Sequence, residues 1–138
     1  MEPKAVAASV ILVNNENKIL MCLRDNKKGI LYPNCWDLIG GEKIKGETPY
    51  EAVKRECLEE IGICPCKIHK FMTLKTPYHI ENVYWSFFDK SVTELTCGEG
   101  QKLAFLTPEE IQSQNIAFNF KHICLLFLSY INGYRKNE

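Results

Sequence analysis

The most constraining feature of this chain is an acidic segment framed by glycines. Glycines stand at positions 40, 41 and 46, and glutamates at positions 47, 56, 59 and 60 follow at fixed spacing. Like charges four residues apart on a helix repel by about 0.2–0.5 kcal/mol per pair. A fold that keeps these acids together therefore predicts a neutralising partner. A hard divalent cation such as Mg²⁺ takes carboxylate oxygens and brings phosphate groups with it.

Local signals set the limits of one helix in this segment, over residues 49–61. Thr48 is a favourable N-cap, Pro49 occupies the first helical position, and Glu51 completes a capping box. Gly62 follows the last turn, where a glycine commonly ends a helix. These signals predict a helix of about three and a half turns.

This predicted helix is amphipathic. On a wheel of about 100° per residue, Glu56, Glu59 and Glu60 share one side. The opposite side is expected to pack against a sheet and consists of Val53, Cys57, Leu58 and Ile61. A solvated acidic face, which is common on surface helices, is the alternative interpretation. The neighbouring glycines favour a ligand site instead, because a backbone without Cβ atoms can approach a ligand closely.

The remaining pattern predicts strands before and after this helix. Segments suited to strands span residues 5–13, 18–24, 36–39, 67–74, 82–89 and 103–106, with loops at 25–35 and 91–101. A short helix is expected to begin after Thr107, and an amphipathic helix over residues 120–132 is expected to end at Gly133. The fold class is therefore α/β, with a mixed β-sheet sandwiched between helices (α/β/α). The length fits a single domain over residues 1–138.

Composition argues against several classes of partner. The 17 basic and 17 acidic side chains give a formal net charge of zero, which argues against a nucleic-acid polymer or an anionic membrane. No run approaches the ~18 apolar residues of a membrane span. The N-terminus lacks a signal-peptide pattern, so a cytoplasmic location is expected. Seven cysteines, an odd number, argue against a disulfide framework.

The acidic segment resembles the Nudix box, the signature of the Nudix hydrolases, at each of its specified positions. The signature reads Gly, five residues, Glu, seven residues, Arg-Glu, an aliphatic residue, any residue, Glu-Glu, any residue, Gly and an aliphatic residue. Its positions here are Gly41, Glu47, Arg55, Glu56, Cys57, Glu59, Glu60, Gly62 and Ile63. Of these, Cys57 departs from the usual residue type. Trp36 and the run 99–101 add a looser similarity to MutT-like members, and the resemblance implies the Nudix fold over nearly the whole length.

The resemblance implies hydrolysis of a nucleoside diphosphate linked to another group, with Mg²⁺ or Mn²⁺ as cofactor. The metal ligands that it implies are the Gly40 carbonyl and the carboxylates of Glu56, Glu59, Glu60 and Glu99. The catalytic set that it implies is Glu56, Glu99, Arg55 and Glu47. In this set Glu47 supports the site, and Arg55 orients a glutamate by ion pairing. Either Glu56 or Glu99 takes the proton from water, and the resemblance leaves that choice open.

The substrate-binding residues are indicated less sharply. The resemblance places Arg24 on a substrate phosphate, and Lys27 and Lys28 either assist it or are solvated loop residues. The candidates for the base pocket are Tyr78, His79, Phe87, Phe118, Asn119 and Phe120. Asn119 either reads a purine edge with its amide or caps the helix that follows, because asparagine suits both roles.

The expected function is that of a Mg²⁺-dependent nucleoside triphosphate pyrophosphohydrolase, which releases a monophosphate and pyrophosphate. An ordinary or oxidised purine nucleotide, such as 8-oxo-dGTP, is the leading substrate. A nucleotide-sugar or dinucleoside-polyphosphate hydrolase is the second interpretation, and a non-catalytic nucleotide-binding module is the third. The expected partner is a small nucleotide, and the sequence is compatible with a monomer or a homodimer.

Overall fold

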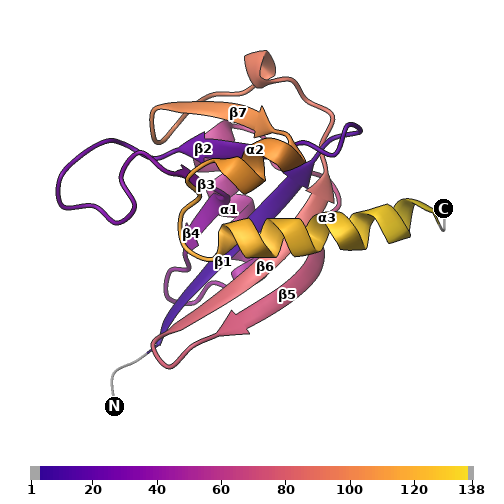
Figure 1. Ribbon diagram of the computed structural model, residues 1–138. Helices are drawn as coiled ribbons and strands as arrows, with labels where there is room; N and C mark the ends of the chain where they lie inside the picture. Colours follow the sequence, from indigo (N-terminus) through magenta and orange to yellow (C-terminus); the bar gives the residue numbers. More distant parts are fainter. Residues whose placement is uncertain (1–3, 137–138) are drawn as a thin grey trace.

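Strand β1 (Ala5–Val13) runs through the middle of the sheet and organises the fold (Figure 1). The structure is a computed structural model, which describes residues 4–136. β1 pairs in parallel with β6 (His79–Phe87) and antiparallel with β2 (Ile19–Leu23) and β4 (Ile39–Glu42). Strands therefore lie along both edges of β1, and the sheet is mixed in direction.

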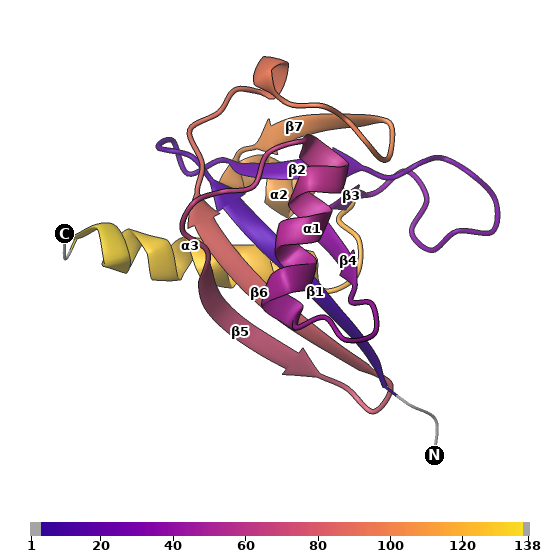
Figure 2. The same ribbon diagram turned by 180° about the vertical axis from the view of Figure 1, so that it is seen from behind.

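Helices cover both faces of this sheet. β2 also pairs with β3 (Trp36–Asp37) and β7 (Lys102–Leu106), and β5 (His69–Lys75) pairs antiparallel with β6. Helix α1 (Pro49–Ile61) lies on one face, whereas α2 (Pro108–Ser113) and α3 (Phe120–Lys136) lie on the other (Figures 1 and 2). The predicted α/β/α arrangement is confirmed. In the described part of the chain, no helix is long and apolar enough to cross a membrane.

Successive side chains along β1 point to opposite faces of the sheet and belong to two separate hydrophobic cores. Ile11 belongs to the core under α3, together with Trp85 and Phe127. Val10 points to the other face and packs with Val53 of α1. Each fully buried aliphatic or aromatic side chain of this kind contributes about 1.5–3 kcal/mol. The second core holds α1 against the sheet, and this places the glutamates of α1 beside β4.

The limits of α1 are those predicted from its capping residues. The Thr48 hydroxyl accepts a hydrogen bond from the Glu51 amide at 3.1 Å, and the Glu51 carboxylate accepts one from the Thr48 amide at 2.9 Å. At the other end, Gly62 has a φ of 78°, and its amide donates to the carbonyls of Cys57 and Leu58. The left-handed φ is the reason a glycine suits this position.

Several predicted bounds differ from the structure; β6, for example, spans residues 79–87 rather than 82–89. The strand expected over residues 36–39 is two strands, because β3 pairs with β2 and β4 pairs with β1. Helix α3 does not end at Gly133 but continues to Lys136. A glycine inside a helix costs about 1 kcal/mol. The last turn offsets this cost, because the Tyr134 ring packs 5.3 Å from the Trp85 ring and Arg135 donates to the Asn14 carbonyl.

Candidate active site

Three carboxylates converge at the end of α1. Glu56 and Glu60 come from the helix and Glu99 from the loop before β7, and their ligand oxygens lie within 4.8 Å of one another. Glu60 is buried and accepts a hydrogen bond from the Gly40 amide at 2.9 Å. A set made only of carboxylate oxygens suits a hard cation such as Mg²⁺ or Mn²⁺. The residues present therefore fit the metal that the signature implies.

Burial makes Glu60 an unusual acid. Desolvation, and next a hydrogen bond to Glu56 and the charges of Glu56 and Glu99, raise the pKa of Glu60 to about 10. The Gly40 amide opposes this shift in part. A divalent cation among the three carboxylates would stabilise the charged form of each. Without a cation, the three neighbouring carboxylates repel one another when they are charged, and a bound metal would offset this repulsion.

The predicted face of α1 is wrong for two residues, Glu60 and Leu58. Glu60 lies about 20° from Val53, which is the centre of the buried face, whereas Leu58 lies far round the helix. Leu58 is 58% exposed, so its predicted place in the core is wrong. Glu60 is buried instead because the backbone of β4 runs beside it and supplies the Gly40 amide. The apolar and acidic faces of α1 overlap at this residue.

Gly40 and Gly41 allow β4 to pass between β1 and the acids. A Cβ atom on Gly40, which has a φ of 152°, would collide with the Ala8 carbonyl oxygen. A Cβ atom on Gly41 would lie 2.9 Å from the Glu56 carboxylate. Both glycines thus have a steric reason here, because any side chain would push β4 away from β1 or from α1.

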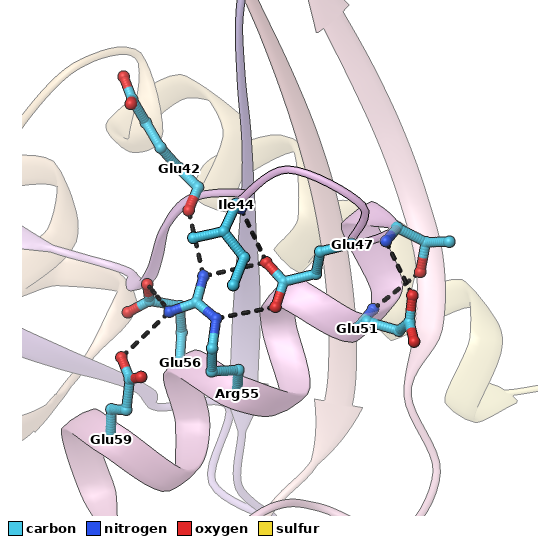
Figure 3. A network of polar contacts seen from close by, with 8 residues as sticks. Glu42, Ile44, Glu47, Glu51, Arg55, Glu56 and Glu59 are labelled. Atoms are coloured by element: carbon cyan, nitrogen blue, oxygen red, sulfur yellow. Dashed lines mark hydrogen bonds and ion pairs between the residues drawn. The ribbon is translucent and has the colours of Figure 1, made fainter.

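Arg55 connects Glu56 of this cluster to two acids outside it, Glu47 and Glu59 (Figure 3). Its Nε and Nη2 atoms donate to the two carboxylate oxygens of Glu47 at 2.8 and 3.1 Å. Its Nη1 atom donates to Glu56 at 2.9 Å and to Glu59 at 3.1 Å. The hydrogen bond from Arg55 holds the pKa of Glu47 below its ordinary value. A planar guanidinium suits this task because it offers several donors in fixed directions.

Glu59 does not lie among the three clustered acids. Its side chain is 57% exposed and turns to Arg55. The Arg55 guanidinium also forms ion pairs with Glu47 and Glu56, and its role in orienting a catalytic glutamate stays a prediction. The structure therefore brings Glu56, Glu60 and Glu99 together beside Gly40, and the role of Glu59 as a metal ligand stays a prediction.

A cavity of about 160 Å³ adjoins the acids. It is lined by Cys22, Arg24, Asp25, Ile30, Asp37, Leu38, Gly40, Glu60, Glu99 and Gly100. Arg24 donates from Nη1 to Asp37 at 2.9 Å and from Nε to the Leu31 carbonyl at 2.9 Å. Burial raises the pKa of Asp37 to about 6 although Arg24 lowers it. Arg24 thus lines the cavity with an acid already beside it, and its contact with a substrate phosphate stays a prediction.

The two lysines of the loop after β2 are solvent-exposed. Lys27 contacts Asp25 at 3.5 Å with 69% of its side chain exposed. Lys28 is likewise exposed. This loop projects away from the sheet between β2 and β3 (Figure 1). The solvated interpretation of these lysines is the one that their placement favours.

A second cavity of about 220 Å³ lies under α3. It is lined by Tyr32, Leu74, Thr76, His79, Glu81, Phe118, Asn119, Phe120 and Ile123. The rings of Tyr32 and Phe118 lie 4.7 Å apart, and both residues have a left-handed φ, of 50° and 55°. Such backbone is uncommon for aromatic residues and is frequent at functional sites. Arg24 lies 5.6 Å from the Phe118 ring and so connects the two cavities.

This second cavity contains four of the six predicted base-pocket residues, namely His79, Phe118, Asn119 and Phe120. Tyr78 is 71% exposed and does not line it. Phe87 lies eight residues from His79 on β6, roughly 26 Å away, under Arg135. Among residues 4–136, the Asn119 side chain makes no hydrogen bond that would cap α3, although its carbonyl accepts one from Ile123.

Sequence reasoning missed Tyr32, Asp37 and Glu81. Glu81 lies in the second cavity and contacts His79 at 3.0 Å. Burial raises the pKa of the Glu81 carboxyl, and the contact with His79 opposes that shift. The predicted strand begins at residue 82, three residues after the observed start of β6 at His79, and so leaves Glu81 out. Glu81 and Val83 lie two residues apart and so share one face of β6, and this period of two was the signal that could have identified Glu81.

Comparisons with known proteins agree with this geometry. The family profile of the NUDIX domain matches residues 3–126. An uncharacterised Nudix hydrolase of Listeria monocytogenes is 35% identical over 114 residues, which are 75% of this chain and 64% of that protein. The nucleoside triphosphatase NudI of Salmonella typhimurium is 28% identical over 129 residues, which are 83% of this chain and 91% of NudI.

A solved structure shows the same fold. The crystal structure of a mutT/nudix family protein from Listeria innocua superposes with a TM-score of 0.82 and covers 100% of both chains. The two sequences are 15% identical, so the likeness concerns the fold alone.

Proposed function

The chain belongs to the Nudix family as a MutT-like member, and from this premise we propose that it is a Mg²⁺-dependent nucleoside triphosphate pyrophosphohydrolase. Members of this family hydrolyse phosphoanhydride bonds, and NudI is named a nucleoside triphosphatase. The observation that carries the proposal is the row formed by the acidic cluster, the cavity at Arg24 and the aromatic cavity. One end of this row offers carboxylates that suit a cation and the other offers aromatic rings that suit a base, as a nucleotide requires.

The acids at one end would hold the divalent cation. When bound, it neutralises phosphate oxygens and lowers the pKa of a coordinated water. Glu56, Glu60 and Glu99 are its proposed ligands, together with the Gly40 carbonyl, and we retain Glu59 as a fourth carboxylate. Arg55 fixes Glu56 from outside the cluster, so that this carboxylate does not have to be ordered when substrate binds. Either Glu56 or Glu99 would accept the proton of the attacking water.

The centre of the row suits the phosphate chain. Arg24 lines the first cavity, and its contact with Asp37 fixes the direction of the guanidinium. The buried Asp37 charge also limits how much negative charge this cavity accepts, so Arg24 offers one phosphate contact rather than a strongly basic pocket. This agrees with a substrate whose charge is neutralised mainly by metal.

The other end suits a purine. Tyr32 and Phe118 present aromatic faces at the mouth of the second cavity, and base–aromatic stacking contributes about 1–3 kcal/mol per base. Inside the cavity, the Glu81 carboxyl accepts hydrogen bonds, and the Asn119 amide can donate and accept them. A guanine-type edge offers adjacent N–H donors that match these groups. A purine of this type, ordinary or oxidised, is the proposed base.

A substrate panel with product identification tests the proposal. The panel contains ordinary and 8-oxo nucleoside triphosphates, nucleotide sugars and dinucleoside polyphosphates, each with Mg²⁺ and with EDTA. We expect pyrophosphate and a monophosphate from a purine triphosphate, and no turnover in EDTA. Sugar phosphate as the product would replace the proposal with the nucleotide-sugar hydrolase. Binding without turnover of any substrate would replace it with a binding module.

Matched variants test the site separately from the substrate. Glu56→Gln should lower kcat by about a hundredfold or more, whereas Glu109→Gln, on the exposed start of α2, should leave it unchanged. Asn119→Ala should instead raise KM for the purine and leave kcat within a fewfold. Wild-type rates in the Glu56→Gln protein would show that the cluster is not the catalytic site.

A further inference from the structure

The loop that carries Glu99 is seated on the C-terminal end of α1. The Thr96 amide donates to the Ile61 carbonyl at 3.1 Å, and the Gly98 amide donates to the Glu60 carbonyl at 2.8 Å. These carbonyls belong to the last turn of α1, which has no intrahelical donors for them. A Cβ atom on Gly98 would collide with the Glu59 carbonyl oxygen. The loop therefore follows the helix end at backbone distance.

The same loop is held from its other side by the end of β2. The Gln101 amide donates to the Leu23 carbonyl at 2.8 Å, and the Gln101 side chain donates to the Arg24 carbonyl at 2.8 Å. Gly100 has a φ of 76°, and a Cβ atom there would lie 2.5 Å from the Cys22 sulfur. Glu99 thus lies between two anchored backbone segments that start from different elements.

Two thiols converge on the backbone of Glu99 itself. The Cys22 Sγ atom donates to the Glu99 carbonyl at 3.0 Å, and the Cys97 Sγ atom donates to the same oxygen at 3.3 Å. A carbonyl oxygen has two lone pairs and can accept both. Cys22 is buried in the core under α1, whereas Cys97 is exposed on the loop. One donor belongs to the sheet and the other to the loop, so the pair links the peptide of Glu99 to the core.

We propose that Cys22 and Cys97 are positioning residues for the metal site, which fix the Glu99 carbonyl and thereby direct the Glu99 carboxylate to Glu56 and Glu60. The inference rests on the proposed function, because it takes Glu99 as a member of the metal site. An exposed glutamate on a loop loses both backbone and side-chain freedom when it binds a cation. Fixing its backbone in advance lowers the backbone part of that cost, and a weak thiol donor can do so from inside an apolar core at a small desolvation penalty.

Binding of Mn²⁺ to the intact protein, followed by electron paramagnetic resonance, tests the proposal without reference to turnover. Loss of one hydrogen bond should raise the Kd for Mn²⁺ by about two- to tenfold in Cys97→Ala and Cys22→Ala. Cys97→Ser and Cys22→Ser keep an O–H donor and should bind within about twofold of wild type. Cys66→Ala, at an exposed cysteine elsewhere, is the matched control and should bind as wild type does.

Mn²⁺ binding to Glu99→Gln distinguishes a failure of the proposed metal site from a failure of the positioning role. If this variant and the wild type bind Mn²⁺ equally, Glu99 is outside the metal site, and the proposed site is overturned together with the inference. If Glu99→Gln weakens binding but Cys97→Ala does not, the site stands and the positioning role is overturned. If Cys22→Ala fails to fold, Cys97→Ala alone tests the positioning role, because removal of an exposed thiol leaves no buried cavity. Faster amide hydrogen exchange over residues 96–101 in metal-free Cys97→Ala would support the positioning role.

Discussion

Replacing Glu60 with glutamine should stabilise the metal-free protein and abolish metal binding. Glu60 is 6% exposed, and burial with the neighbouring acids raises its pKa to about 10. At neutral pH the folded protein therefore holds Glu60 protonated, whereas the unfolded chain ionises it. A glutamine imitates the protonated acid: its carbonyl can accept from the Gly40 amide and its amide can donate to Glu56. Unlike Glu60, this glutamine does not have to take up a proton when the chain folds.

The size of the effect follows from the pKa of glutamate in the unfolded chain, about 4.3. Because burial raises the folded pKa above 7, protonating Glu60 on folding at pH 7 costs the wild type roughly 2–4 kcal/mol. The folded state binds more protons than the unfolded state between these two pKa values. Wild-type stability is therefore lost as pH rises from about 4.3 towards 10, and the glutamine variant escapes this loss.

Urea unfolding in EDTA at pH 5, 6, 7 and 8 measures the difference. Glu60→Gln should exceed wild type by about 2–4 kcal/mol at pH 7, and the gap should widen by about 1.4 kcal/mol per pH unit. Added Mg²⁺ should stabilise the wild type but not the variant. Glu109→Gln, at an exposed position, should show neither effect. An equal or lower stability of Glu60→Gln at pH 7, or a gap independent of pH, would refute the reasoning.

Three further substitutions have effects that the structure predicts. The free energy of unfolding of Asp37→Asn should rise by about 2–3 kcal/mol relative to that of wild type as pH rises from 4 to 6, because folded Asp37 has a pKa of about 6 against about 3.9 in the unfolded chain. Urea titrations at each pH measure this difference. Gly98→Ala should lower the melting temperature and weaken Mn²⁺ binding, since its Cβ atom would collide with the Glu59 carbonyl. Gly133→Ala should raise the free energy of unfolding by about 0.5–1 kcal/mol, because it lies in α3 with no atom near a new Cβ.

Features that depend on neighbouring residues in the chain were predictable from the sequence. The N-cap Thr48, the capping partner Glu51 and the terminal Gly62 act within one turn of the helix ends they define, so the limits of α1 followed from composition and spacing. The extension of α3 past Gly133 did not, because its last turn is stabilised by Trp85, which lies nearly fifty residues earlier. Local propensity favoured a helix end there, and tertiary packing overrode it.

The same distinction divides the candidate site. The acids of α1 and Glu99 were identified by their resemblance to a known signature. The burial of Glu60 and the presence of Glu81 in the second cavity depend on strand register, which pairs Gly40 with Ser9 and Glu81 with Ala7. A shift of one residue in β4 would move the Gly40 amide away from Glu60, and a shift of one residue in β6 would turn the Glu81 side chain to the other face of the sheet. That register is a long-range property, and no local pattern in this chain specifies it.

The placement of the one arginine in the acidic segment explains why a cation is required where we propose it. Arg55 contacts Glu47, Glu56 and Glu59, and so compensates the outer part of the cluster. Within the part of the chain that the structure describes, Glu60 and Glu99 have no ion-pair partner. The carboxyl groups without a basic partner therefore lie beside Gly40, where the first cavity opens. A protein that used these acids only for stability would place an arginine or lysine there, whereas a site for a divalent cation has to leave that position free.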